Sequence, residues 1–319
     1  MRNFTKTLTV LSAVGMLFSL TACSNDSSNA GGGINSIATS GAESSPYLQG
    51  AELSNMFTES TEHDVQNQAS GGFNENPGLV NSGDMEFGLG LEIDLLNAYE
   101  GSAPFDVEHD SLRRVMTVAV SPYHVVTTPG SGIETISDLA GNSVNLGVVT
   151  QTTRTINDGI LEAIAVSPSD LDIHSITTGE AFTSIQDGVI DASANFFAQG
   201  FGGLQDFANT SSAALASVSE EEFAAIDEQF SSLLNPYTIP GGTYNGIDED
   251  VETFSMAVVL YAHEDVDESV VHDMVEAYHD NFDDLSSSQL FSGVELDTLR
   301  GDTIVPEHPG ATEYFESVE

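Results

Sequence analysis

Apolar residues recur along this chain with two periods, that of a strand and that of a helix. The clearest case lies within residues 130–154. Residues 144–149 are a β-branched apolar run of strand length, and Ile156, Ile160, Leu161 and Ile164 then repeat at helical spacing. The loop between them would present hydroxyls and free N–H groups at a helix N-terminus, which suits a carboxylate. The alternative is an ordinary strand–helix unit in which the threonines only cap the helix.

The same alternation continues through most of the chain. Strands are expected at 34–38, 65–69, 85–89, 171–176, 192–197 and 254–261. Two further β-rich segments, 115–120 and 124–127, are separated by Ser121, Pro122 and Tyr123. Residues 209–230 are predicted to be helical, 235–250 to be a long Gly- and Pro-rich loop, and a helix capped by Asp267 to bury a stripe of Val271, Met274, Val275, Tyr278 and Phe282.

Two short segments indicate an internal repeat. Gly83-x-Met85-Glu86 and Gly188-x-Ile190-Asp191 each follow a predicted helix and precede a predicted strand. Alternating strands and helices predict parallel βα units, with ligand-binding loops at the carboxyl ends of the strands. We therefore expect an α/β protein of two lobes joined by a hinge, with a ligand cleft between them. The first lobe is assigned to 34–127 plus 251–319, and the second to 128–250.

The charge balance narrows the possible partners. The chain carries 50 Asp and Glu residues against 6 Lys and Arg, a formal net charge of −44. Nucleic acid is excluded as a partner because phosphate binding needs clustered Lys and Arg. Self-repulsion at this charge destabilises a compact state in dilute buffer, whereas molar salt shortens the Debye length to about 3 Å. The composition therefore predicts a halophilic protein.

The first residues have the pattern of a secretion signal. Residues 1–22 contain Arg2, Lys6 and a short apolar run, and then end in Leu-Thr-Ala before Cys23. This order resembles a bacterial lipobox, so Cys23 is the expected site of lipidation and of anchoring to a membrane. The alternative is a free cysteine beside an ordinary cleavage site. Residues 23–33 are rich in Ser and Gly and are expected to form a flexible tether. The mature protein is expected to be periplasmic or on the cell surface.

Longer segments carry a family resemblance. They are S-S-P-Y-L-Q-G at 44–50, H-V-V-T-T-P-G-S-G-I-E-T-I-S-D-L-A-G-N-S-V-N-L-G at 124–147, I-Q-D-G-V-I-D-A-S-A-N-F-F-A-Q-G at 185–200, I-P-G-G-T-Y-N-G-I-D-E-D-V at 239–251 and P-E-H-P-G-A-T-E-Y-F at 306–315. The chain resembles the TAXI family, the solute receptors of one class of TRAP transporters.

The resemblance implies a type II periplasmic-binding-protein fold. It also implies binding of a small carboxylate-bearing metabolite, an organic acid or an amino acid such as glutamate, and its delivery to TRAP permease subunits in the membrane. Two loops depart from the family pattern. Residues 150–154 are bulkier and more polar than the usual small-residue loop, and Gly90-Leu91-Glu92 stands where a serine is common. Both loops are expected to face the ligand, so the family's usual ligand is not assumed.

Candidate ligand contacts lie in the loops and strand ends that would line the cleft. They are Ser44, Ser45, Tyr47, Gly90, Glu92, Thr150, Thr152, Thr153, Arg154, Phe196, Phe197, Thr243 and Tyr244. Arg154 could hold a ligand carboxylate in bidentate fashion, with the three threonines donating to the same group. The alternative for Arg154 is a surface salt bridge of little energetic weight.

The other candidates also have two interpretations. Glu92 could accept from a ligand amine or be a solvated acid. Ser44 and Ser45 could contact ligand or cap a helix, and Thr243 and Tyr244 could close over ligand or pack a turn. One of Phe196 and Phe197 is expected to lie in the core, while the other walls the cleft.

No enzyme motif is present. The chain contains no H-E-x-x-H, G-x-S-x-G or P-loop pattern, so no catalytic residue, metal or cofactor is expected. His272, Glu276 and His279 share one predicted helix face, which more simply indicates a solvated acidic helix than a metal site. The alternatives to a TRAP receptor are the binding protein of an ABC importer, which uses the same fold, an exported α/β enzyme, and an adhesin without a ligand.

Overall fold

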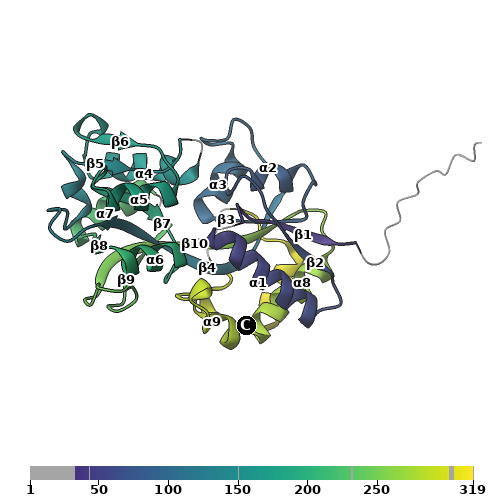
Figure 1. The fold of residues 1–319 in the computed structure, drawn as a ribbon. Helices are drawn as coiled ribbons and strands as arrows, with labels where there is room; N and C mark the ends of the chain where they lie inside the picture. The colour runs from purple at the N-terminus through teal and green to yellow at the C-terminus, as the bar shows by residue number, and fades with distance from the viewer. Residues whose placement is uncertain (1–32, 43, 150, 231–232, 302–304, 319) are drawn as a thin grey trace, which may run out of the picture. The chain divides into compact units, whose positions relative to one another are not determined.

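Ten strands form one mixed sheet in the part of the chain that the computed structural model describes, residues 33–42, 44–149, 151–230, 233–301 and 305–318 (Figure 1). The main strand order is β2-β1-β3-β10-β4-β7-β5-β6, with β8 paired to β4 and β9 paired to β10. The expected signal segment 1–22, Cys23 and the expected tether up to residue 32 lie outside the described residues. No helix in the described ranges is long and apolar enough to cross a bilayer.

The first part of the chain forms what we call the N-terminal unit, residues 35–100. Its elements are β1 (Asn35–Ala38), α1 (Ser45–Ser60), β2 (Val65–Gln68), α2 (Asn76–Asn81), β3 (Phe87–Leu91) and α3 (Glu92–Glu100). Strand β1 lies in the middle and pairs in parallel with both β2 and β3.

The central unit, residues 143–196, has the same order of elements. It consists of β5 (Ser143–Asn145), α4 (Thr152–Ala163), β6 (Asp172–His174), α5 (Thr178–Gln186) and β7 (Ala192–Phe196), with short 3-10 turns at Ile136–Leu139 and Pro168–Asp170 nearby. Here β5 lies in the middle and pairs in parallel with β6 and β7.

The repeated segments make the same contacts in both units. Gly83 and Gly188 both have positive φ, 72° and 68°, in the turn before the third strand. The Glu86 carboxylate accepts the Ser36 N–H at 2.8 Å, and the Asp191 carboxylate accepts the Ser143 N–H at 2.8 Å. Each acid thereby ties the start of its third strand to the middle strand. The repeat expected from the sequence is confirmed at these positions.

Two long strands join the units. Strand β4 (Leu112–Thr127) pairs with β10 (Val251–His263) over residues 112–122 and with β7 and β8 (Ala214–Ala216) over residues 123–127. Strand β10 pairs with β3 over residues 258–262 and with β9 (Leu234–Ile239) over residues 251–256. Both strands belong to both ends of the sheet, so the expected lobe boundaries at 127/128 and 250/251 stay predictions.

Two bulges interrupt the β4–β10 ladder. Val258 pairs with Ala119 and Val259 with Thr117, and after one further pair Tyr261 pairs with Arg114. One extra β4 residue is therefore accommodated at each shift. Residues opposite each other on antiparallel strands point to the same face, so Arg114 and Thr117 share a face although they are three positions apart.

The two faces of β3 bury different kinds of residue. Phe87, Leu89 and Leu91 enter the main core with α1 and α8 (Glu268–Asp280). Gly88 and Gly90 face the other way, toward Tyr261, which lies in a smaller core with Leu95 of α3. A third core surrounds Tyr244 and the phenylalanines that flank β7.

The remaining helices cover the rest of the sheet. They are α6 (Gly202–Thr210), α7 (Glu220–Gln229), α9 (Phe282–Ser286) and α10 (Pro309–Val318), with 3-10 turns at Gln289–Phe291 and Leu296–Thr298. Figure 1 shows α8 close to α1 beneath the strands β1 and β2. In α8 the expected stripe of Val271, Met274, Val275 and Tyr278 is buried, whereas Phe282 begins α9 and is half-buried.

Several expected elements are wrong. Residues 115–120 and 124–127 belong to one strand, and Pro122 lies where β4 changes partner from β10 to β7. The predicted helix 209–230 contains the end of α6, strand β8 and α7. The predicted loop 235–250 begins with β9 on the edge of β10, where Pro236 is tolerated. Strand β5 is only Ser143–Asn145, shorter than 144–149.

Every arginine in the described ranges pairs with an acid. The pairs are Arg113–Glu264, Arg114–Glu92, Arg154–Asp158 and Arg300–Glu307. These four cations offset only a small part of the 50 carboxylates of the sequence. The remaining repulsion must be screened by dissolved salt or overcome by the cores.

The first prediction concerns this repulsion. Lowering KCl from molar to about 0.05 M, where the Debye length exceeds 10 Å, is expected to lower Tm by tens of degrees or unfold the protein. Circular dichroism during thermal unfolding measures this. Sucrose at matched osmolality is the control, since it stabilises compact states without screening charge. A Tm independent of KCl would contradict the halophilic interpretation.

Candidate functional site

In each unit, one buried asparagine donates hydrogen bonds to main-chain oxygens at the carboxyl ends of the parallel strands. Asn76 donates to main-chain oxygens of β1 and β3 and to that of Thr39, at 2.7 to 3.2 Å. Asn157 donates at 3.1 Å to the main-chain oxygens of Leu146, just after β5, and of Ala194 in β7. Ligands of open α/β sheets bind beyond these strand ends, so the candidate site is sought there.

A hydroxyl–amide network lies at this end of the central unit. Thr153 donates to the Asn195 side chain at 3.3 Å, and Asn195 donates to the Thr178 hydroxyl at 3.1 Å. These residues come from the first turns of α4 and α5 and from β7. The expected contact residue Thr153 is therefore joined to two residues that the sequence did not single out.

Asp94 is the most unusual side chain in this region. It is the third residue of α3 and is 0% exposed, and neither of its carboxylate oxygens makes a hydrogen bond of full geometry with a described residue, although the Thr152 hydroxyl and the Leu91 N–H approach it. The buried hydroxyls of Tyr261 and Thr152 also make no hydrogen bond of full geometry in that part of the chain. Buried polar groups are normally paired, so three unpaired ones call for an explanation.

These three groups come together from separate elements. A Cβ placed on Gly90 would lie 3.8 Å from the Tyr261 hydroxyl oxygen and 3.9 Å from the Asp94 Cβ. Tyr261 comes from β10 and covers Gly88 and Gly90: a Cβ on Gly88 would lie 2.6 Å from its ring and collide, and one on Gly90 would make a tight contact at 3.3 Å. The Thr152 hydroxyl, from the first residue of α4, is near enough to Asp94 to affect its ionisation. The N-terminal and central units thus meet at this carboxyl.

The environment changes the acid–base properties of the cluster. Burial raises the pKa of Asp94 to about 7, although the Thr152 hydroxyl and the Leu91 N–H favour its charged form. Burial also raises the pKa of Tyr261, and the neighbouring Asp94 raises it further. Asp94 therefore changes charge near neutral pH while the phenol stays protonated.

Glu92, two residues earlier, has a different role in the structure. Both of its carboxylate oxygens accept a hydrogen bond from Arg114 Nε at 3.2 Å, and both side chains are buried. Arg114 Nη2 also donates to Thr117 at 2.6 Å, and Nη1 donates to the main-chain oxygen of Arg300. Glu92 is thus part of a buried ion pair that joins α3 to β4, and its expected contact with a ligand amine stays a prediction.

Other expected contacts are placed near the strand ends but have protein partners. Arg154 donates to Asp158 at 2.9 Å and to Ser175 at 2.9 Å. Ser44 caps α1 by accepting the Tyr47 N–H at 3.3 Å, and Ser45 is buried in the first turn. These contacts fit the capping and surface-pair alternatives and do not test ligand binding.

The aromatic candidates lie in the cores around β4. Tyr244 is buried and its hydroxyl contacts His124 Nε2 at 3.0 Å and the Gly200 N–H at 3.1 Å. Burial lowers the pKa of His124 to about 4, so this histidine is neutral. Phe197 is buried, whereas Phe196 is half-buried against Tyr123 at a ring distance of 5.1 Å.

Two threonines complete the set of expected contacts. The main-chain carbonyl of Thr243 accepts a hydrogen bond from the Gln205 side chain at 2.6 Å. Thr150 lies outside the described residues.

Comparison with known proteins gives the family. A family model described as "NMT1-like family" matches residues 37–318. The chain belongs to the NMT1-like family. The match spans both the N-terminal and central units and the strands that join them.

Solved structures share the fold of this NMT1-like protein. One comes from work on glutathione import through GshT and the cystine ABC importer TcyBC of Streptococcus mutans, with a TM-score of 0.53 and 11% identity over 88% of this chain and 99% of that chain. An ancestral arginine-binding protein bound to arginine has a TM-score of 0.52 and 10% identity over 80% and 97%. The periplasmic aliphatic sulphonate binding protein SsuA from Escherichia coli has a TM-score of 0.50 and 12% identity over 89% and 82%.

These likenesses confirm the expected fold. The NMT1-like chain has the α/β, two-lobe type II periplasmic-binding-protein fold. Identities of 10% to 12% say nothing of the ligand.

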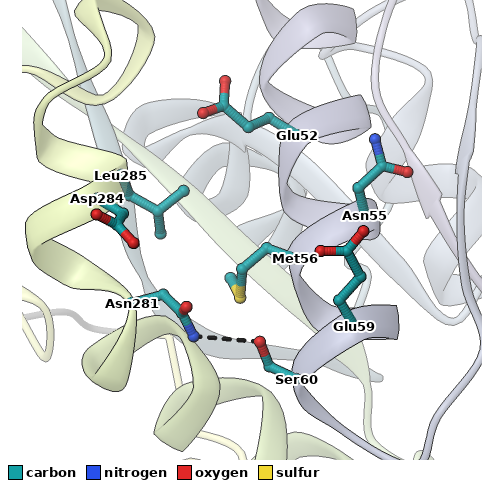
Figure 2. A pocket seen from close by; sticks show the side chains of 8 residues that line it. All are labelled: Glu52, Asn55, Met56, Glu59, Ser60, Asn281, Asp284 and Leu285. Atoms are coloured by element: carbon teal, nitrogen blue, oxygen red, sulfur yellow. Dashed lines mark hydrogen bonds between the residues drawn. The ribbon is translucent and has the colours of Figure 1, made fainter.

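An open groove lies elsewhere, between α1 and α9. Figure 2 shows Glu52, Glu59 and Asp284 around it, with Asn281 donating to Ser60 at 3.2 Å. None of the expected ligand contacts that the structure describes lines this groove. On α8, His272, Asp273 and Glu276 have ligand atoms within 4.8 Å of one another, but His63 already contacts Asp273 at 2.9 Å and Glu276 is exposed. Solvated acids account for both places.

The most informative site residues, Asp94 and Tyr261, were missed from the sequence. Glu92 and Asp94 are both acids in the first turn of α3, and only the structure shows that Glu92 has Arg114 as its partner. One sequence signal did exist. Glycines alternate with large apolar residues in Phe-Gly-Leu-Gly-Leu at 87–91, which indicates that a bulky group packs against that face of the strand.

The second prediction tests the structural role of the Glu92 pair. Arg114→Met is expected to lower the free energy of unfolding by about 3–5 kcal/mol, because it leaves a buried carboxylate unpaired. Arg113→Met, at the neighbouring and more exposed Glu264 pair, is the matched control and is expected to cost less than about 1 kcal/mol. Urea unfolding in molar KCl measures both. Equal losses for the two variants would contradict this assignment.

The third prediction uses the unpaired state of Asp94. Asp94→Asn is expected to stabilise the ligand-free protein by about 2 kcal/mol at pH 8, or roughly 5 °C in Tm, because it removes a buried charge. Burial raises the pKa of Asp94 in the folded state to about 7, so its protonated form contributes stability to the wild type. That stability is fully present below about pH 4 and is lost as the pH rises through about 7. The gain in Tm should therefore be small at pH 4, grow to pH 7 and then level off.

Thermal unfolding from pH 4 to 9 in molar KCl checks this profile. Glu100→Gln, at the exposed end of the same helix, is the control and should leave Tm unchanged. A loss of stability in Asp94→Asn at all pH values would show that Asp94 has a stabilising partner in the folded protein.

Proposed function

We infer that this protein is an extracytoplasmic solute-binding receptor of a membrane importer. The observation that carries the proposal is the meeting of two equivalent βαβαβ units, through Asp94 and Thr152, at the carboxyl ends of their strands. Two long strands join the units, so they can separate to admit a solute and close over it. Membership of the NMT1-like family and the likeness to periplasmic binding proteins support this function over catalysis.

The proposed solute is a small carboxylate-bearing metabolite, an organic acid or an amino acid such as glutamate. The threonines at the start of α4 and the first-turn N–H groups of that helix are the proposed donors to the carboxylate. Arg154 lies two positions farther along the same helix. The two departures from the TAXI pattern are the proposed sources of ligand preference: residues 90–92 precede Asp94 by two positions, and residues 150–154 include Thr152.

The proposed permease is of the ABC type. The Streptococcus mutans neighbour belongs to work on an ABC importer, which supports this type over the TRAP permease predicted from the TAXI resemblance. Export and attachment through a lipidated Cys23 complete the proposal, and they rest on the signal-like residues 1–22.

The fourth prediction is ligand-induced stabilisation. A cognate solute at about 100 times its Kd is expected to add about 2.7 kcal/mol to the free energy of unfolding. Thermal shift in molar KCl with organic acids, amino acids and sulfonates measures it. Lysozyme, which is not a receptor, controls for general effects of each compound. Catalytic turnover of any panel member, without a shift from the rest, would contradict the receptor function.

Reconstituted transport separates the two permease types. The receptor is added to vesicles carrying the permease encoded beside its gene. Uptake that requires internal ATP supports the ABC proposal. Uptake that follows a sodium gradient without ATP would contradict it and favour the TRAP alternative.

A further inference from the structure

The cluster of Asp94, Tyr261 and Thr152 has an unused capacity to accept hydrogen bonds. The carboxylate has two acceptor oxygens, and each hydroxyl has acceptor lone pairs. All three side chains are at most 7% exposed, and none makes a hydrogen bond of full geometry with a described residue; only the Thr152 hydroxyl and the Leu91 N–H approach the Asp94 carboxylate. A ligand group that donates several hydrogen bonds from a single atom fits this arrangement, and a protonated amine is such a group, with three donors and no acceptor.

Resting on the receptor function proposed above, we propose that this cluster binds the protonated amino group of the solute. Asp94 and Tyr261 form the fixed part of the subsite, since β10 and α3 both pack on β3. Thr152 belongs to the other unit and reaches the subsite from α4. The amine therefore contacts both units at once, so its binding favours the closed arrangement of the protein.

The distribution of charge favours a cation at this point. All four arginines in the described ranges are engaged by acids, and the net charge of the chain is −44. A carboxylate placed against Asp94 would meet a like charge in a medium of low dielectric constant, where repulsion is strong. An ammonium group there is attracted by the same field and neutralises a buried charge.

The position of Thr152 narrows the class of solute. It is the first residue of α4, a 12-residue helix whose N-cap residue Gln151 makes no capping bond with its side chain. First-turn N–H groups at such an end attract a carboxylate. An amine on Asp94 with a carboxylate on the adjacent carbon would place the anion at this helix end. A zwitterionic α-amino acid therefore fits better than an organic acid or a sulfonate.

The test compares matched pairs of probes. Glutamate with glutarate, alanine with propionate, and arginine with 5-guanidinovalerate each differ by the α-amino group alone, and taurine with ethanesulfonate extends the set to sulfonates. Isothermal titration in molar KCl is carried out on the wild type, Asp94→Asn, Tyr261→Phe and the control Glu100→Gln. At least one α-amino acid is expected to bind the wild type and Glu100→Gln equally, at least about 100-fold more tightly than its amine-free partner.

The variants distinguish recognition from a structural role. Asp94→Asn is expected to lose about 100-fold or more in affinity for the amino acid while its ligand-free Tm rises. Tyr261→Phe is expected to lose about 10-fold and provides a second variant that removes one hydroxyl alone. A purely structural role of Asp94 would lower Tm in Asp94→Asn and leave affinity unchanged in whatever protein remains folded.

Two results would overturn the amine subsite while the receptor function stands. One is tight binding of an amine-free acid or sulfonate that Asp94→Asn leaves unchanged. The other is a wild-type Tm that rises when NaCl replaces choline chloride at equal ionic strength, with no such rise in Asp94→Asn, because the subsite would then hold an inorganic cation. Failure of every probe to bind the wild type would overturn both proposals.

Discussion

The antiparallel pairing of β4 with β10 is the constraint on which the rest of this structure depends. Each of the two parallel units is a three-stranded sheet with its own central strand, and β1 and β5 each pair only with the other two strands of their own unit among the described residues. The two long strands convert these units into one sheet. They also set where the carboxyl ends of the parallel strands lie, since β3 and β7 pair directly with β10 and β4.

Two acids in the first turn of α3 show how neighbouring residues acquire opposite roles. Glu92 faces Arg114 and contributes an ion pair that is satisfied within the protein. Asp94 faces Tyr261 and Thr152, and its buried carboxyl has neither a counter-ion nor a hydrogen bond of full geometry among the described residues. Such a group lowers the stability of the unliganded protein, and the cores around β4 and β10 must offset that cost. This pattern is common where a protein holds a site ready for a ligand.

The sequence predicted the fold much better than the site. Local periodicity and glycine turns were sufficient to find the alternating elements and the repeat at Gly83 and Gly188, because both depend on nearby residues. It failed where tertiary pairing overrides local preference, as in β4 through Pro122 and in the strand β8 within the expected helix. The sequence could not distinguish Glu92 from Asp94 for the same reason, since only the fold reveals which acid meets Arg114.

The bulges of β4 make this strand tolerant of changes in length as well as in composition. Val115 and Val118 have no partner of their own in the ladder, while the residues on either side of each keep their partners on β10. Deleting one of these valines would regularise the ladder and leave Arg114 opposite Tyr261, on the face where Glu92 and Thr117 lie. Relatives that conserve this ion pair should therefore tolerate a one-residue alignment gap at either bulge.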